Sequence, residues 1–465
     1  MPKPTPKLER TTFITSKELE YFSVKELSRE LGSNSVKWPL VLTKELIDNA
    51  LDACETSDIA PAITVTLEGT MVCVADNGPG LPESTLRASL NYNSRTSDKA
   101  HYISPTRGQI GNALKCLWAG PFVYNLEYGN DERGSVTVTT PLYSYEITVA
   151  VDKIQQKPKL IPVLLDREFV KTGTLIEIEW KAVAGYIPVE IADFYNSDED
   201  EDKDGEIEDE EVPPPRTFAE EVQFLLESYA TFNPHATFYL RRDGQTITVA
   251  QPLLPGWNKW RTDDPTSPHW YDADELRTLI AGYISNEKGT MTVREFVKEF
   301  RYLSGTAKQK AVVAAANLSG QCLNDLVSND DIDISKVKSL LKALQVASRP
   351  VKAAMMGLIG AETLSRRLSE IDGAVSEGIQ YVKVPSEDAR PTLIEVVFGV
   401  RRDDNGGRRM RFGLNCSPAF ECPVQGLESF LQYGLSIDPD APISMAVHIM
   451  RPGLEFTSRA KSMLT

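Results

Sequence analysis

The chain has 465 residues, 41% of them hydrophobic, which is typical of a globular protein with two to four domains. The sequence has no apolar stretch long enough to span a bilayer, and its N-terminus lacks the apolar run of a signal peptide, so we expect a cytoplasmic protein with no membrane partner. Six cysteines are scattered singly, without a CxxC pair or a His/Cys cluster, which favours buried reduced thiols over a metal site.

The net charge of −16 argues against a nucleic-acid partner until its location is considered. Between Asp198 and Glu211, eleven acidic residues stand against one lysine, a net −10, which leaves −6 for all other residues. We interpret residues 196–216 as a disordered surface insertion. An acidic decoy for a basic partner, or a DNA mimic, is the alternative.

The first informative element is the helix predicted around KELIDNALDA, from Lys44 to Ala53. At about 100° per residue, Glu45, Asn49 and Asp52 fall on one narrow stripe of this helix, beside apolar positions. A polar stripe is usually a solvated face, and a functional site is the alternative.

Two alternating strand patterns then lead into the tight turn DNGPG. Asp76 stands at the end of a strand, where its carboxylate can accept a hydrogen bond from an exocyclic amine. Gly78 and Gly80 let the backbone approach a ligand.

A polar loop further along is followed by GQIG, residues 108–111, at the start of an apolar helix. Glycines ahead of a helix N-terminus predict an anion site, because free N–H groups and the helix dipole meet there. The segment VKTGTLIEIEW then places Gly173 and Thr174 in a turn that enters an alternating strand.

Each signal is weak alone, but the order ExxxNxxD, DNGPG, GQIG and GT resembles the Bergerat ATP-binding fold of gyrase, Hsp90, histidine kinases and MutL. The resemblance implies ATP and Mg²⁺ as cofactors, with Glu45 as the general base that activates water and Asn49 as the magnesium ligand. It also implies the other ATP contacts: Asp52 as a supporting pocket residue, Asp76 as the adenine-reading acid, Thr174 as its neighbour, and Gly78, Gly80, Gly108, Gln109 and Gly111. Ala113 stands where the family usually has its third lid glycine. A GxxxxGK[ST] motif is missing from the sequence, so a P-loop is excluded.

The rest of the chain resembles one branch of this family, the B subunit of topoisomerase VI. The segment Asn233-Pro234-His235-Ala236 resembles the end of that subunit's ATPase domain, and SPHWYDADELRTLIAGY with FRYLSGTAKQKAVVAAANL resembles its helical H2TH domain. By pattern alone, residues 291–371 are a run of amphipathic helices. Lys461, in SRAKSML, matches the switch lysine that reaches from the transducer domain to the γ-phosphate, and a plain surface lysine is the alternative.

The expected fold is therefore α+β and multidomain. We expect a Bergerat-fold α/β sandwich ATPase domain with a mixed sheet over residues 1–256, a small H2TH-like helical domain over 257–375, and a ribosomal S5-like transducer domain over 376–465.

Strands are predicted from Gln380 onward, and TLIEVVFGVRRDDNGGRRMRFGLN predicts a β-hairpin around the turn Asn405-Gly406-Gly407. The residues that we expect to contact DNA phosphates are Arg401, Arg402, Arg408, Arg409 and Arg411 in this hairpin, and Lys308 and Lys310 in the helical domain. The hairpin is similar to the basic GRR-containing transducer loop of topoisomerase VI. A solvated hairpin tip that keeps an edge strand from aggregating is the alternative.

The resemblance implies an ATP-hydrolysing subunit that forms an ATP-dependent homodimer, clamps duplex DNA and drives a separate cleaving subunit. We find no Toprim-like acidic set and no winged-helix tyrosine, and the sequence stops at Thr465, so we expect cleavage to need a Toprim/winged-helix partner like the topoisomerase VI A subunit. In a bacterium or archaeon such a protein would be associated with the nucleoid.

The alternative function is a stand-alone Bergerat ATPase clamp, Hsp90-like or regulatory, without topoisomerase activity. A histidine kinase is disfavoured, because none of the four histidines sits in a dimerisation helix upstream of the KELIDNALDA helix.

Overall fold

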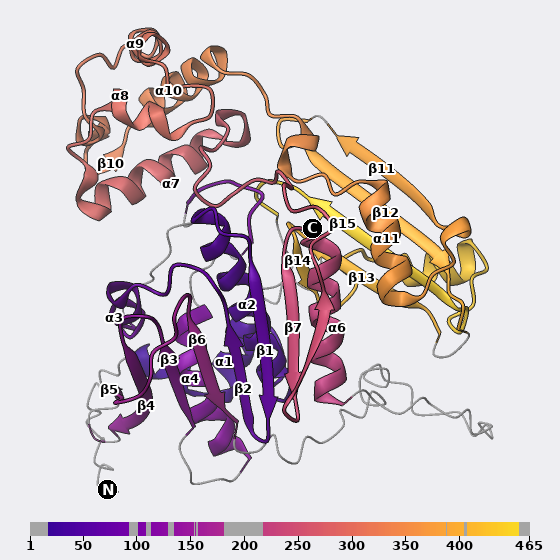
Figure 1. The fold of residues 1–465 in the computed structure, drawn as a ribbon. Coiled ribbons are helices and arrows are strands. Elements are labelled where there is room, and N and C mark those ends of the chain that lie inside the picture. Colours follow the sequence, from indigo (N-terminus) through magenta and orange to yellow (C-terminus); the bar gives the residue numbers. More distant parts are fainter. Residues whose placement is uncertain are drawn as a thin grey trace, which may run out of the picture.

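A computed structural model of the chain describes residues 17–92, 101–107, 113–128, 134–152, 154, 157–180, 217–386, 388–403 and 407–454. These residues form an α/β part on an eight-stranded sheet, a helical part, and a second α/β part on a five-stranded sheet (Figure 1). The expected α+β, multidomain class is confirmed. Several predicted features lie outside the described residues: the acidic insertion, Gly108, Gln109, Gly111 and Lys461.

The eight-stranded sheet has the order β5-β4-β3-β6-β2-β1-β7-β8. Its strands are β1 (Ala62–Glu68), β2 (Met71–Ala75), β3 (Ser135–Thr139), β4 (Ser144–Asp152), β5 (Lys157–Leu164), β6 (Leu175–Glu179), β7 (Thr237–Arg242) and β8 (Gln245–Ala250). The sheet is mixed, because β1 pairs with β7 in parallel and every other neighbouring pair is antiparallel. In β1 and β2, buried residues alternate with partly exposed ones, so one face of the sheet lies against the core.

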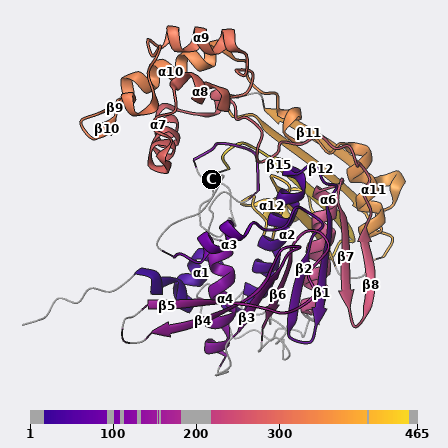
Figure 2. The same cartoon turned by 60° about the vertical axis from the view of Figure 1, so that its left-hand side comes forward.

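Helices cover that face. They are η1 (Lys17–Phe22), α1 (Val24–Leu31), η2 (Ser35–Lys37), α2 (Trp38–Thr56), α3 (Glu83–Ser89), α4 (Ala113–Glu127) and α6 (Phe218–Phe232). Helix α2 lies between α4 and α6 and packs on β1 and β2, and it begins with Pro39 in its first turn, where proline is preferred (Figure 2). The first turn of α6 is fixed by a capping box between Thr217 and Glu220.

The helical part has its own core, from Trp260 to Val351. Its elements are η4 (Pro268–Trp270), α7 (Ala273–Tyr283), η5 (Ile284–Lys288), α8 (Val293–Phe296), η6 (Val297–Glu299), α9 (Thr306–Ala315), η7 (Leu323–Leu326), the short strands β9 (Val327–Ser328) and β10 (Asp331–Ile332), and α10 (Ile334–Ala347). No helix in the described ranges is both long and apolar enough to cross a membrane.

The second α/β part follows. It contains η8 (Ala353–Met356), α11 (Ala361–Asp372), η9 (Ser376–Gly378), β11 (Gln380–Ser386), β12 (Thr392–Val400), β13 (Arg409–Leu414), β14 (Ser417–Ala419), α12 (Leu427–Ser429), η10 (Phe430–Gly434) and β15 (Ile443–Met450). Helix α11 packs on β11, β12 and β15, so it belongs to this sheet, although the sequence pattern grouped it with the helical domain.

The hairpin predicted between β12 and β13 is wrong. The strand order is β11-β12-β15-β13-β14, and β15 lies between the two strands, antiparallel to β12 and parallel to β13. The arginine-rich segment is therefore a crossover past the start of β15, where Val400 pairs with Ile443 and Arg409 with Ser444. A local turn signal predicted pairing of its flanking strands, but β15, the last strand among the described residues, pairs with both.

Helix α6 joins the two sheets. It contacts β7 and β8 of the larger sheet as well as β13, β14 and α11 of the second part. Because the hairpin of β13 and β14 also reaches α2, the second part forms one wall of the pocket described next.

Candidate functional site

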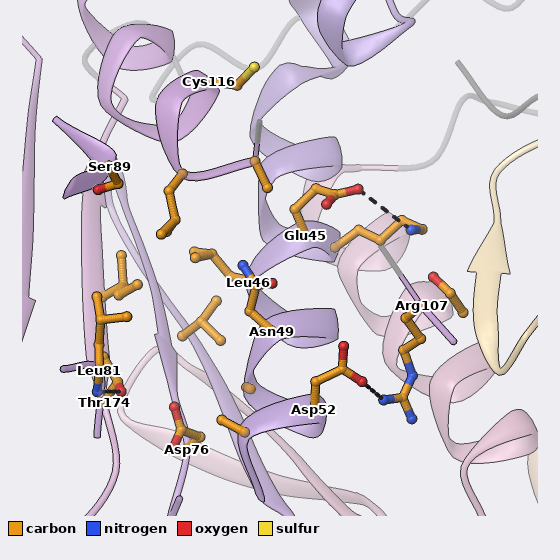
Figure 3. Close-up of a pocket in the computed structure, with 18 of the residues that line it drawn as sticks. Glu45, Leu46, Asn49, Asp52, Asp76, Leu81, Ser89, Arg107, Cys116 and Thr174 are labelled. Carbon is orange, nitrogen blue, oxygen red and sulfur yellow. Dashed lines mark hydrogen bonds and ion pairs between the residues drawn. The ribbon is translucent and has the colours of Figure 1, made fainter. Parts of the chain in front are cut away.

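A pocket of about 1230 Å³ opens beside α2 and is large enough for a nucleotide-sized ligand (Figure 3). Its walls come from α2, from the turn after β2, from the start of α4 and from the hairpin of β13 and β14. Of the residues predicted from the sequence, the structure brings Glu45, Asn49, Asp52, Asp76, Gly80 and Thr174 together in its lining.

Glu45 and Asn49 lie one turn apart on α2, and both line the pocket. The Asn49 side chain is exposed, whereas 24% of the Glu45 side chain is accessible. Lys44 Nζ lies 3.9 Å from Glu45 Oε1 and 3.0 Å from Asp48 Oδ2. The pocket therefore holds a carboxylate that can accept a proton, with a cation beside it and an amide one turn away.

Asp76 lies across the pocket from Asn49 in Figure 3, at the end of β2. Its backbone N–H donates to the Thr174 carbonyl at 3.0 Å, and its Oδ1 accepts from Gly78 N at 2.7 Å. Burial raises the pKa of Asp76, although hydrogen bonds from Gly78 and Thr174 oppose the rise. A partly buried carboxylate fixed in this way can accept a hydrogen bond from an amino group of a ligand.

Three glycines shape this end of the pocket. Gly80 has φ +87°, in the left-handed region, and a Cβ at Gly78 would lie 2.9 Å from Asp76 Oδ1. Gly173 was not among the predicted site residues, yet it has φ +73° and a Cβ there would lie 1.9 Å from the Asp76 carbonyl oxygen. The glycine-threonine turn therefore has a definite role: only glycine lets the bend ahead of β6 approach Asp76.

One carboxylate oxygen of Asp52 is held by Arg107. Arg107 Nη1 donates to Asp52 Oδ1 at 2.6 Å, and the guanidinium also donates to Glu55 (3.1 and 2.7 Å) and Asn233 Oδ1 (2.6 Å) (Figure 3). The Arg107 side chain is fully buried. Arg107 directly precedes residues 108–111, so this cluster fixes the chain ahead of the predicted phosphate loop to α2.

Glu55, near the C-terminal end of α2, contacts two more basic side chains. Lys259 Nζ lies 2.6 Å from Glu55 Oε2 and His235 Nε2 lies 3.0 Å from Oε1. Burial alone would raise the pKa of Glu55, but the charges of Arg107 and Lys259 hold it well below its usual range. The sequence reasoning missed Arg107, Glu55 and Lys259. The only local signal was the position of Arg107 immediately before the glycines.

Asp48 connects α2 with the second sheet. Ser417 Oγ donates to Asp48 Oδ2 at 2.7 Å and the Tyr229 hydroxyl donates to Oδ1 at 2.8 Å. Burial would raise the pKa of Asp48, but the charges of Lys44 and Arg107 and the Ser417 hydrogen bond together lower it. Asp48 is therefore a buried carboxylate with donors from three separate elements.

Behind Ser417 lies a buried polar row. Cys416 Sγ is 3.7 Å from His448 Nε2, and His448 Nδ1 is 3.1 Å from Glu395 Oε2. Burial would lower the pKa of His448, but its contacts with Cys416 and Glu395 raise that pKa to about 9. Cys416 and His448 are inaccessible to solvent, so the contacts among Cys416, His448 and Glu395 stabilise the five-stranded sheet. They offer no nucleophile to a substrate.

The residues present suit a Mg²⁺–nucleotide complex. Asn49 supplies an exposed amide oxygen, and within the described ranges no group of three or more His, Cys, Asp or Glu could hold a metal ion alone. Mg²⁺ commonly takes few protein ligands and completes its shell with phosphate oxygens and water, so a single protein ligand fits this mode. Bound there, the ion would neutralise charge developing on the phosphates.

The structure corrects the arginine prediction. Arg401 and Arg411 are 3% exposed, and Arg411 Nη2 lies 2.7 Å from Asp372 Oδ1 and 2.9 Å from Glu227 Oε2. They cannot reach a phosphate from these positions.

The other predicted DNA contacts differ in accessibility. Arg408 lies 3.2 Å from Glu428, Arg409 is partly exposed beside Asp403, and Arg402 is exposed. Lys308 and Lys310 are exposed on α9. Asn405 and Gly406 lie outside the described residues.

Comparison with known proteins adds a resemblance along most of the chain. The chain is 24% identical, over an alignment 471 residues long, to the B subunit of type 2 DNA topoisomerase 6 from Methanococcoides burtonii. The match covers 93% of this chain and 65% of that protein. The Archaeoglobus fulgidus protein of the same name is 28% identical over 459 residues, with 92% and 67% covered. The Methanosarcina mazei protein is 32% identical over 165 residues, 33% of this chain and 25% of that protein. The chain thus spans about two thirds of the length of the first relatives.

No protein-family model matches the chain. Solved structures with a similar arrangement include the Aquifex aeolicus MutL ATPase domain complexed with ADP (TM-score 0.33, 11% identity, 89% of this chain and 92% of that one) and the B-subunit of DNA gyrase from Myxococcus xanthus (0.35, 9%, 96% and 86%). At these scores we base no argument on them. The resemblance expected from the motifs is confirmed by the sequence relatives: over nearly its whole length, this chain resembles the B subunit of type 2 DNA topoisomerase 6.

Proposed function

We propose that the chain binds and hydrolyses ATP in the pocket beside α2. The observation that carries this proposal is the arrangement of Glu45 and Asn49 on one helix, facing a partly buried carboxylate, Asp76, across a pocket of about 1230 Å³. Phosphoryl transfer to water needs an oriented water, a cation on the phosphates and backbone donors. Glu45 and Asn49 suit the first two tasks, and the motif resemblance assigns the third to residues 108–111.

In this proposal each residue has a separate role. Glu45 is the general base that takes a proton from the attacking water, and Asn49 holds Mg²⁺. Asp76 accepts a hydrogen bond from the adenine amino group, beside Thr174 and the glycines of the DNGPG turn. Gly108, Gln109 and Gly111 would contact phosphate and Lys461 the γ-phosphate; these roles rest on the motif resemblance alone. Asp52 has a supporting role through Arg107.

We further propose that two ATP-bound copies close on duplex DNA and act with a separate cleaving subunit of the topoisomerase VI A kind. Support comes from the similarity to topoisomerase 6 B subunits over 92–93% of the chain. Arg402, Arg409, Lys308 and Lys310 are the predicted phosphate contacts that stay accessible.

A second candidate is an ATPase clamp that acts without DNA. The burial of Arg401 and Arg411 favours it, because it removes two of the five arginines on which the DNA prediction depended. The two candidates share the pocket and differ in duplex binding.

The test compares Glu45→Ala with the wild type and with Glu362→Ala, a control that removes an exposed glutamate from α11. Glu45→Ala should bind a fluorescent ATP analogue within about threefold of wild type while its turnover falls by ~10² or more, because general-base catalysis contributes on that order. Asn49→Ala should lose the Mg²⁺-dependent part of binding. Equal turnover in Glu45→Ala and wild type would refute the assignment.

A further inference from the structure

The turn between β13 and β14 is strained. Leu414 pairs with Ser417, so only Asn415 and Cys416 form the turn, and their φ angles are +49° and +68°. Such two-residue hairpin turns favour Asn-Gly, because both central residues adopt positive φ. A cysteine at the second position is unfavourable and persists only where the surrounding contacts fix it.

Contacts from three directions fix this turn. Asn233 Nδ2, at the end of α6, donates to the Cys416 carbonyl at 2.8 Å. The Asn415 side chain donates to the Arg451 carbonyl at 3.1 Å and accepts from the Arg451 backbone N–H at 2.9 Å. The Cys416 thiol packs against His448, which Glu395 holds from the neighbouring strand. The turn is therefore a rigid extension of the five-stranded sheet.

This extension ends on α2. The Ser417 hydroxyl donates to Asp48 Oδ2 at 2.7 Å, and the same oxygen accepts from Lys44 Nζ at 3.0 Å. Lys44 Nζ also lies 3.9 Å from Glu45 Oε1. One buried carboxylate oxygen is thus shared by a hydroxyl from the second sheet and by the ammonium group beside the proposed general base.

We infer that Ser417 is a positioning residue for ATP hydrolysis, acting through Asp48 and Lys44 on the Glu45 carboxylate. The inference rests on the proposed function of Glu45 and names how the second sheet controls it. While Ser417 satisfies Asp48, the Lys44 ammonium is shared between Asp48 and Glu45. Without that hydroxyl, Asp48 draws Lys44 more strongly, and Glu45 loses the cation that orients it.

The test uses the full chain, four single variants and the double variant Ser417→Ala with Lys44→Met. Ser417→Ala removes the donor, Ser417→Thr keeps a hydroxyl, and Lys44→Met removes the cation. Ser444→Ala is the matched control, since Ser444 is also buried in the five-stranded sheet, at the start of β15, and pairs at the Arg409 end of β13 away from the turn.

Ser417→Ala should lower kcat ~10-fold, equivalent to about 1.4 kcal/mol of barrier. The dissociation constant for a non-hydrolysable ATP analogue should stay within twofold, and Ser417→Thr should recover most of the turnover. Lys44→Met should show a similar loss, and the double variant should lose little more, because both changes break one chain of contacts. Ser444→Ala should match wild type.

Three outcomes would overturn the inference: unchanged kcat in Ser417→Ala, a loss of kcat matched by an equal loss of analogue binding, or fully additive losses in the double variant. If Ser417→Ala does not fold, Lys44→Met still decides the matter, since normal turnover there excludes the relay. A wild type that binds but does not hydrolyse ATP would overturn the proposed function as well, whereas normal wild-type turnover with these outcomes overturns the positioning role alone.

Discussion

Replacing Arg107 by methionine should destabilise the protein strongly, although the residue is not predicted to touch the nucleotide. The substitution removes four hydrogen bonds of 2.6–3.1 Å to Asp52, Glu55 and Asn233 and leaves buried carboxylates with fewer cations. Breaking a buried ion pair from one side costs about 3–5 kcal/mol. Because the entropy of unfolding is about 2.1 cal/mol/K per residue, a chain of 465 residues that unfolds as one unit should lose ~3–5 °C of Tm.

The stability lost in Arg107→Met should also depend on pH. In the folded protein the pKa of Glu55 lies well below its usual range, with Arg107 the largest favourable cause against burial. A depressed carboxyl pKa contributes stability above the unfolded pKa of about 4.3 and loses it as pH falls through the folded value. The Tm difference between wild type and Arg107→Met should therefore be full above pH ~5 and shrink below pH ~4.

The assay is thermal unfolding followed by tryptophan fluorescence between pH ~2.5 and 8, a range that extends below the unfolded pKa of Glu55. Arg107→Lys should fall between wild type and Arg107→Met, because an ammonium keeps the charge but not the forked geometry. Arg261→Met is the control, since it removes an exposed ion pair with Asp58 worth ~0–1 kcal/mol. A Tm for Arg107→Met within 2 °C of wild type at pH 7, or a difference that does not shrink in acid, would refute this reasoning.

Three other outcomes follow from named contacts. Arg411→Ala should lower the free energy of unfolding by about 3–5 kcal/mol, measured by urea denaturation, because it leaves buried Asp372 and partly buried Glu227 without this cation; a change below ~1 kcal/mol would contradict the burial argument. Gly173→Ala should lower analogue binding at least ~10-fold, measured by fluorescence titration, whereas Gly69→Ala, at φ +56° with open space, should not. The pair Arg402→Ala and Arg409→Ala should weaken duplex binding regardless of sequence and flatten its salt dependence by roughly 0.9 log unit for each phosphate that is no longer neutralised, measured by anisotropy; an unchanged slope would favour the clamp that acts without DNA.

The grouping of residues at the proposed nucleotide site could be predicted because its signals are local. Glu45 and Asn49 lie on one helix, so a period of 3.6 residues per turn is enough to place them on the same face. The position of Asp76 follows from a strand pattern that ends in a tight turn. Asp52 lies on the same predicted stripe but faces Arg107, 55 positions away in the sequence. Nothing in the helix pattern distinguishes a carboxylate that faces a ligand from one that faces a buried arginine.

Strand order and buried charge could not be predicted for a related reason. The segment from Arg401 to Arg411 has the composition of an exposed turn, yet Arg411 pairs with Glu227, 184 positions earlier, and β12 and β13 are separated by β15. These contacts depend on how α6, α11 and β15 meet. Local charge density is a sound guide to the surface only where no such element covers the segment.

Helix α2 is the element on which all parts of the molecule converge. Glu45 and Asn49 line the pocket, and beside them Asp48, Asp52 and Glu55, spaced four and three residues apart, form a buried acidic stripe, of which Asp52 also borders the pocket. The stripe meets a different segment at each step: Ser417 from the second sheet, Arg107 ahead of the predicted phosphate loop, and Lys259 at the entry to the helical part.

Buried ion pairs add little net stability compared with apolar packing. A gain in stability therefore does not explain why α2 carries three buried carboxylates. What they impose is geometry, because each pair tolerates only a narrow range of distances and angles. We infer that the acidic stripe fixes α2 relative to the other two parts, so that neither part can shift without breaking a contact to the helix that carries Glu45. Coupling between the nucleotide and the rest of the molecule then follows from how α2 is held, without any ligand contact outside the pocket.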